Sequence, residues 1–261
     1  MPETRVMAGG RRVSGCEKLS GRVRAVLRPM NRIVFPELLD SLSPEDPRAV
    51  GSRRDLQRLN RRMHSADIIA RALKRSFPGS PPRRLLELGG GDGTLLLAVA
   101  ARLASQWRGV EAELLDQRDL LAPEISGRFS ELGWSITSRE ADVLAWANDG
   151  DTTPRDAILA NLFLHHFKQP ELSTVLGAIA ERASVFVALE PRRSTFFLVV
   201  TRLLWLMGCN AVTRHDARVS VRAGFRGREL SRLWPSKRSW SLVEERASPF
   251  SHLFLACSVK A

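Results

Sequence analysis

The sequence contains no tyrosine, only three cysteines and only five lysines among its 40 basic residues. Cys16, Cys209 and Cys257 lie far apart and form no Cys-x-x-Cys pair, so neither a disulfide framework nor a zinc knuckle is indicated, and we expect a cytoplasmic protein. The most apolar stretch, residues 195–207, is shorter than the roughly 20 residues of a membrane-spanning helix and contains Arg202. No membrane span is therefore predicted.

The net charge of +12 is carried almost entirely by arginine. A basic balance of this size is typical of proteins that bind nucleic acid. Because lysine is scarce and tyrosine is absent, a genome-wide compositional bias could produce the same charge. The charge is therefore weak support for a nucleic-acid partner. The proportions of hydrophobic (44%) and charged (26%) residues are those of a globular protein and exclude disorder throughout.

The N-terminal segment, residues 1–35, differs from the rest of the chain. Its first 29 residues hold seven basic and two acidic residues, and no apolar period is sustained among them. They also lack the uninterrupted apolar region of a signal peptide. Two interpretations remain open: a disordered basic tail, or sequence upstream of a true start at Met30. Organised sequence is predicted to begin near Pro36.

Residues 36–82 are predicted to form a helical cap before the main domain. Apolar residues recur every three to five positions and predict a helix over residues 53–77. The proline-rich segment 78–82 ends this helix, because proline cannot continue it.

Residues 83–261 have the pattern of an α/β domain. Short apolar runs alternate with helical stretches, an order typical of right-handed crossovers and a mostly parallel sheet. The expected strands are 85–88, 112–115, 134–137, 157–162 and 185–189, and the expected helices are 94–106 and 170–183. The last two strands, 239–244 and 252–259, are joined by a short loop and must therefore be antiparallel.

A glycine-rich loop follows the first of these strands. Residues 85–94 read LLELGGGDGT, so the strand runs into Gly89, Gly91 and Gly93 and a helix begins at Thr94. Glycine permits positive φ angles and close backbone approach, which predicts a ligand at the carboxyl end of the strand. The spacing does not fit G-x-G-x-x-G, and no P-loop Gly-Lys-Ser/Thr is present. Asp92 disfavours a phosphate and favours a ligand that carries an ammonium and a sulfonium.

This loop resembles the first motif of the class I S-adenosylmethionine-dependent methyltransferases. The likeness continues in register through Asp116 at the end of the second strand, Asp142 and Val143 after the third, and residues 156–167 (DAILANLFLHHF) at the fourth. It implies S-adenosylmethionine (SAM) as the cofactor. It also implies a Rossmann-like α/β fold: a mostly parallel seven-stranded sheet with a C-terminal antiparallel hairpin and helices on both faces.

The resemblance also implies the cofactor contacts. In this family an acid at the place of Glu87 lies near the methionine part, an acid at the place of Asp116 holds the ribose hydroxyls, and the pair at Asp142 and Val143 contacts adenine. The complete set of implied cofactor residues is Glu87, Gly89, Gly91, Gly93, Asp116, Gln117, Asp142, Val143 and Asn161.

Two histidines are candidate general bases, because imidazole has a pKa near neutrality. His165 follows the fourth strand at the edge where ligands bind, and in related phenol O-methyltransferases this segment often reads Leu-His-Asp-Trp with that histidine as base. His166 replaces the acid here. His215 lies in a predicted insertion, residues 192–236, expected to cover the substrate. The alternatives are that His165 packs against the cofactor or caps the next helix, and that His215 is a solvated loop residue. No metal site is expected.

These features predict methyl transfer to a small, largely apolar acceptor, such as a phenolic or polyketide hydroxyl. Several segments most resemble small bacterial methyltransferases associated with polyketide biosynthesis. One alternative is a nucleic-acid methyltransferase, although the chain has no Asn/Asp-Pro-Pro-Tyr/Phe motif. Another is a catalytically inactive partner subunit, which the intact glycine loop and Asp116 disfavour. A homodimer is left open.

Overall fold

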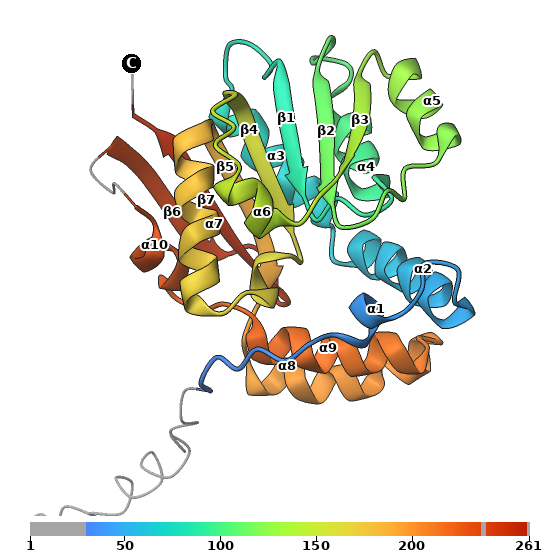
Figure 1. Ribbon diagram of the computed structural model, residues 1–261. Helices are drawn as coiled ribbons and strands as arrows, with labels where there is room; N and C mark the ends of the chain where they lie inside the picture. The colour runs from blue at the N-terminus through green and yellow to red at the C-terminus, as the bar shows by residue number, and fades with distance from the viewer. Residues whose placement is uncertain (1–29, 236–238, 260–261) are drawn as a thin grey trace, which may run out of the picture.

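The centre of the protein is a seven-stranded sheet in the order β3-β2-β1-β4-β5-β7-β6, seen in the computed structural model of Figure 1. The structure describes residues 30–235 and 239–259, so the predicted basic tail of residues 1–29 and Cys16 lie outside the described residues. The strands are β1 (Arg84–Leu88), β2 (Glu111–Asp116), β3 (Ser135–Glu140), β4 (Arg155–Asn161), β5 (Ala183–Pro191), β6 (Trp240–Arg246) and β7 (Ser251–Ser258).

The first five strands are parallel, and β7 runs antiparallel between β5 and β6. This arrangement confirms the predicted mostly parallel sheet and its C-terminal hairpin. The observed strands differ from the predicted ones by a few residues at their ends.

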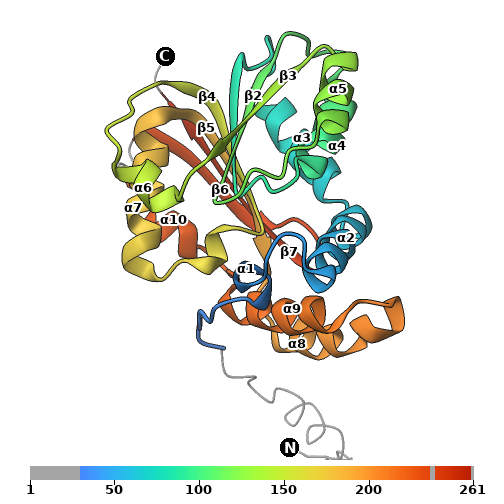
Figure 2. The same cartoon turned by 45° about the vertical axis from the view of Figure 1, so that its right-hand side comes forward.

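Helices cover both faces of the sheet (Figures 1 and 2). Successive side chains of a strand point to opposite faces, so Leu85 packs in one hydrophobic cluster with α3 and α4, whereas Leu86 packs in the other with α6 and α7. The helical elements are α1 (Leu38–Ser41), α2 (Pro47–Arg62), α3 (Ser65–Ser76), α4 (Thr94–Leu103), α5 (Pro123–Glu131), α6 (Val143–Asn148), η1 (Leu164–His166), α7 (Gln169–Arg182), α8 (Thr195–Val200), η2 (Thr201–Met207), α9 (Ala211–Ala223) and α10 (Glu229–Leu233).

The helix predicted over residues 53–77 is wrong as a single element. His64 adopts a left-handed backbone with φ of 56° and separates α2 from α3. The break lets α3 pack on α4 while α2 turns away to contact α9. The most apolar stretch, residues 195–207, forms α8, which the 3₁₀ helix η2 continues. None of the helices in the described part of the chain has the length and apolar character that a membrane crossing requires.

Ordered contacts begin before Pro36, the residue at which the sequence predicts organised structure. Arg32 Nε donates to the Ala223 carbonyl at 2.7 Å, and its Nη2 donates to the Phe167 carbonyl at 2.9 Å. The Ile33 amide donates to the Arg222 carbonyl at 3.2 Å. An extended segment held by such long-range bonds has no periodicity, so the sequence does not reveal it.

Candidate functional site

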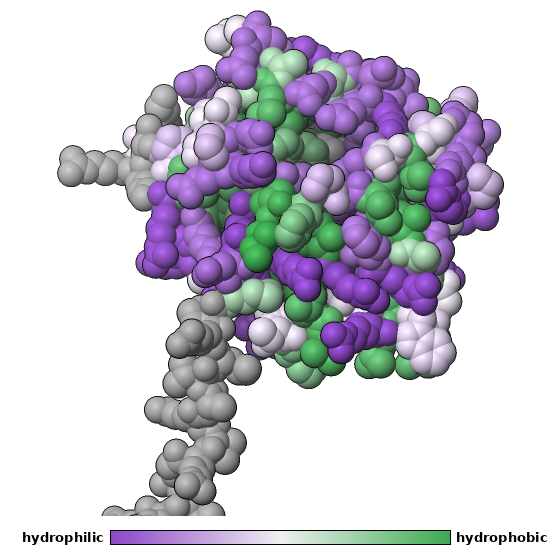
Figure 3. Space-filling model, turned by 60° about the horizontal axis from the view of Figure 1, so that its bottom comes forward, coloured by the Kyte–Doolittle hydropathy of each residue, from purple (hydrophilic) through white to green (hydrophobic). Residues whose placement is uncertain are grey.

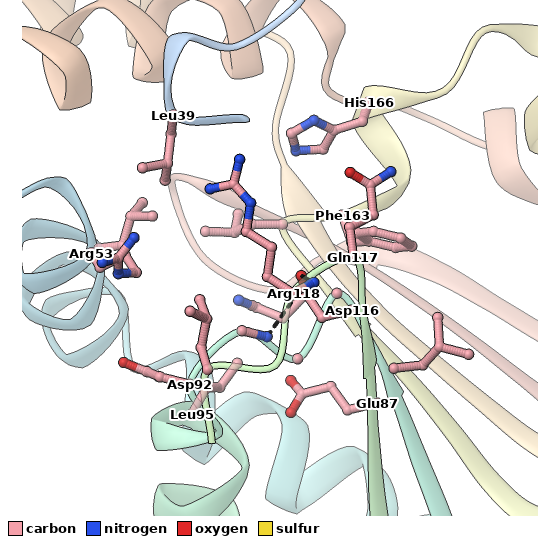
Figure 4. A pocket seen from close by; sticks show the side chains of 18 of the residues that line it. Leu39, Arg53, Glu87, Asp92, Leu95, Asp116, Gln117, Arg118, Phe163 and His166 are labelled. Atoms are coloured by element: carbon pink, nitrogen blue, oxygen red, sulfur yellow. Dashed lines mark hydrogen bonds between the residues drawn. The ribbon is translucent and has the colours of Figure 1, made fainter. Parts of the chain in front are cut away.

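A cavity of about 350 Å³ opens at the carboxyl ends of β1, β2 and β4 (Figure 4). The loops after these strands form its floor, and α2 and the segment around α1 form its opposite wall. In Figure 4, Glu87 and Asp116 lie toward one end, Leu39 and His166 toward the other, and Arg118 between them. This is the edge of a parallel sheet at which ligands bind in α/β folds.

The glycine-rich loop makes a tight turn beneath the cavity. Gly89, Gly91 and Gly93 have φ angles of 68°, 54° and 74°, which side-chain-bearing residues rarely adopt. A Cβ atom at Gly89 would lie 2.3 Å from Cδ2 of Phe163. Gly89 and Gly91 line the cavity. Gly93 instead is the N-cap of α4 and packs near Leu114.

Asp116 is fixed beside this loop by backbone amides. Its Oδ2 accepts from the Gly91 amide at 3.0 Å, and its Oδ1 accepts from the Arg118 amide at 3.2 Å. Burial raises the pKa of this carboxyl above its usual range, although both amide bonds oppose the shift. A carboxylate held in this way keeps lone pairs directed to the cavity, where they can accept hydrogen bonds from hydroxyl groups.

Glu87 is the most perturbed acid of the cavity wall. It is only 3% exposed, and burial, together with the charges of Asp92 and Asp116, raises its pKa to about 8. Its Oε2 and the Oδ1 of Asn161, which also lines the cavity, are buried polar atoms without a hydrogen-bond partner within the described residues. Such atoms are costly unless a ligand satisfies them. A ligand with a cationic group would supply the hydrogen-bond donor and the positive charge that Glu87 Oε2 lacks.

The structure separates the two residues predicted to contact adenine. Val143 lines the cavity, as does the predicted cofactor residue Gln117, but Asp142 does not. Its Oδ1 caps α6 by accepting from the Leu144 and Ala145 amides, and its Oδ2 accepts from Gln117 Nε2 at 2.9 Å. Asp142 thus bonds to a residue that lines the cavity, Gln117.

His165 is not placed to be the predicted general base. It is 2% exposed, its Nδ1 lies 2.8 Å from Glu190 Oε2, and its Nε2 lies 3.2 Å from Glu37 Oε1. Burial alone would lower the pKa of His165, but the hydrogen bonds and charges of the two carboxylates outweigh it and raise the pKa to about 9. The imidazole is thus a buried cation at neutral pH. It carries its proton already and has no free nitrogen with which to accept another.

Glu37 completes this buried ion group, which we call the Glu37–His165–Glu190 triad. Burial opposes ionisation of Glu37, but His165 and further contacts lower its pKa to about 2. Glu37, His165 and His166 bring ligand atoms within 4.8 Å of one another, a spacing that suits a metal ion. Both nitrogens of His165 are already hydrogen-bonded to carboxylates, so its ring has no nitrogen left to bind a metal ion.

His215 is likewise outside the cavity. It lies on α9 with a half-exposed side chain, and its Nδ1 is 2.9 Å from Asp216 Oδ1. Ser220, further along α9, lines the cavity instead. The histidine that does line the cavity is His166, whose Nδ1 lies 3.3 Å from Asp40 Oδ2. It is the only one of the five histidines, all of them described, to do so.

The segment around α1, part of the predicted helical cap, closes the cavity. The guanidinium of Arg118 donates to the carbonyls of Leu42 and Asp40, and the amides of Leu38 and Leu39 donate to Asp216. These bonds join positions far apart in the chain. No local pattern could have revealed them.

No protein-family model and no curated protein sequence matches the chain. Solved structures with a similar fold include an O-methyltransferase family protein from Burkholderia thailandensis, with a TM-score of 0.57 and 18% identity over 82% of this chain and 60% of that one. They also include the plantazolicin methyltransferase BpumL in complex with SAH, with a TM-score of 0.56 and 12% identity over 82% of this chain and 91% of that one.

A third similar structure is the mitomycin 7-O-methyltransferase MmcR, with a TM-score of 0.51 and 19% identity over 84% of this chain and 60% of that one. This chain thus spans less than two thirds of the length of two of these three proteins. The strand order, the glycine turn and these likenesses agree on one architecture. The chain has the fold of the class I SAM-dependent methyltransferases.

Proposed function

We propose that the protein transfers a methyl group from SAM to a small, largely apolar acceptor with a phenolic or polyketide hydroxyl. The observation that carries the proposal is the pair of buried, unpartnered polar atoms, Glu87 Oε2 and Asn161 Oδ1, beside the Gly89–Gly91 turn and Asp116. A structurally similar protein is a plantazolicin methyltransferase in complex with SAH, and another is a mitomycin 7-O-methyltransferase.

The residues that line the cavity support SAM as the ligand. Glu87 and the backbone of the glycine turn would hold the cationic amino acid end, Asp116 would accept from the ribose hydroxyls, and Gln117 and Val143 would flank the base. When bound, SAM supplies an electrophilic methyl group on a sulfonium. The protein must then orient the acceptor and exclude water.

The end of the cavity near α1 suits an apolar acceptor. Leu39, Leu56, Phe163 and Phe167 contribute apolar surface there. His166 is the one titratable ring among them, and Asp40 lies beside its Nδ1 at 3.3 Å. The Nε2 of His166 lies 4.0 Å from Glu37 Oε2, and this nitrogen would turn from Glu37 to an acceptor hydroxyl to take its proton. His166 thus takes the role that the sequence assigned to His165.

The test compares His166→Ala with His215→Ala, a histidine that also lies next to an aspartate but outside the cavity. SAM binding by titration calorimetry should be nearly wild-type in both variants. Turnover on a panel of phenols should fall by roughly 10²–10⁴ in His166→Ala alone, and higher pH should partly restore it. Absence of SAM binding by the wild-type chain would overturn the proposed function. Equal turnover in the two variants would remove the base role of His166 only.

A further inference from the structure

The segment formed by α8 and η2 has two apolar faces. One face, with Phe197, Thr201 and Leu204, is buried in the protein. The opposite face carries large apolar side chains that are 52–66% exposed, and we call it the α8 face: Phe196, Val199, Leu203, Trp205 and Leu206. A surface helix normally has polar residues there. Contiguous exposed apolar side chains usually mark an interaction site.

Figure 3 brings this end of the molecule forward and shows exposed hydrophobic side chains among hydrophilic ones. The polar neighbours are basic. Residues 195–207 contain no acidic residue, and their one charged residue, Arg202, is exposed. A partner that buries the α8 face therefore meets positive charge at its edge.

A group of arginines lies at the N-terminal end of α8. Arg192, Arg226 and Arg246 line one hollow together with Thr195, the first residue of the helix. Burial lowers the pKa of Arg192, and so do the positive charges of Arg246 and Arg226, which lie near its guanidinium. We call this the arginine hollow.

The carboxylates at the arginine hollow are engaged elsewhere. Glu244 is buried and accepts from the Leu230 and Ser231 amides and from His252, and Glu245 pairs with Arg75 at 4.0 Å. The hollow thus keeps a surplus of positive charge next to apolar surface: Phe250, 41% exposed, has its ring 4.8 Å from that of Phe197. Guanidinium groups bind phosphate through paired hydrogen bonds.

We propose that the α8 face and the arginine hollow together bind the surface of an anionic phospholipid bilayer. Phe, Trp and Leu side chains on one face of a short helix, with arginines at its margin, are the composition of helices that lie in a membrane interface. The apolar side chains enter the boundary of the acyl chains, and the arginines bind headgroup phosphates. The alternative occupant, a second copy of this chain, would bring arginines against arginines with no acidic partner on α8 or η2.

The test measures co-sedimentation of the full chain with vesicles. The chain should bind vesicles of phosphatidylcholine mixed with phosphatidylglycerol, bind vesicles of phosphatidylcholine alone much more weakly, and be released by salt. The double variant Leu203→Glu/Leu206→Glu should lower the partition coefficient at least roughly tenfold, because two apolar side chains are removed from the interface. Arg192→Ala should lower it by about fivefold on the anionic vesicles.

The control is Val243→Glu, which places one glutamate at an exposed apolar position of β6 outside the α8 face, against two in the double variant. It should bind vesicles more strongly than the double variant, and SAM binding should be unchanged in every variant. Equal vesicle binding by wild type and the Leu203→Glu/Leu206→Glu variant would overturn the proposal. So would a wild-type dimer that the same double variant converts to monomer, since the α8 face would then bury a second copy.

Discussion

Replacing Glu87 by glutamine tests the raised pKa of this buried carboxyl group. The pKa of Glu87 is about 8 in the folded, ligand-free chain against an ordinary value of 4.5, with burial as its main cause. The folded state therefore holds this proton more tightly than the unfolded state, and stability falls as pH rises from about 4.5 to 8. Each unit of pKa difference corresponds to about 1.4 kcal/mol, so between pH 5 and pH 8 the carboxyl destabilises the fold by about 3–4 kcal/mol.

Glu87→Gln keeps the shape of the neutral acid and cannot ionise. Urea unfolding gives the free energy of unfolding of both chains at pH 5 and pH 8. The difference between variant and wild type should shift in favour of the variant by about 3–4 kcal/mol from pH 5 to pH 8. Binding of a cationic ligand should favour the wild type. Its SAM affinity should rise toward pH 8 as the carboxylate forms, whereas the SAM affinity of the variant should be weaker and should not rise with pH. Parallel pH profiles of stability in the two chains would refute the reasoning.

Three further outcomes are expected. Asp116→Ala should weaken SAM binding at least about tenfold in titration calorimetry, because a charged acceptor of two hydroxyl bonds is lost; equal affinity would remove the ribose assignment. The raised pKa of His165, about 9 against 6.5, stabilises the fold below pH 6.5 and this stabilisation is lost as pH rises through 9, so His165→Gln should show about 2–3 kcal/mol less loss of stability than wild type between pH 7 and pH 10 in urea unfolding. Gly89→Ala should lower the free energy of unfolding by roughly 2–4 kcal/mol through its positive φ and the collision with Phe163, whereas Gly79→Ala, with open space around its Cβ, should change it little.

The sequence predicts those parts of the site that are local to a strand end. The glycine turn and Asp116 directly follow apolar runs, so the parallel sheet brings them to one edge and the structure finds both at the cavity. The histidines were predicted less well. His165 and His166 are neighbours in the short 3₁₀ helix η1, after Leu162 with its φ of 52°.

Which of the two histidines faces the cavity depends on residues remote in sequence. Glu190 and Glu37, 25 and 128 positions away from His165, bond its two nitrogens and hold it in the interior. No pattern around residue 165 contains that information. The same reason explains why the bonds that hold the segment around α1 were not predicted: those to Asp216 span 177 and 178 positions.

The position of β7 has a consequence for how the chain folds during synthesis. β7 is the last strand in the sequence but lies inside the sheet, between β5 and β6. Until it is made, β5 presents an unpaired edge of apolar residues, a surface that invites pairing with other chains. Synthesis must pass through α8, α9 and β6 before this edge is covered. The pairing of β5 with β7 is therefore non-local, and the open edge of β5 is a site of aggregation until β7 covers it.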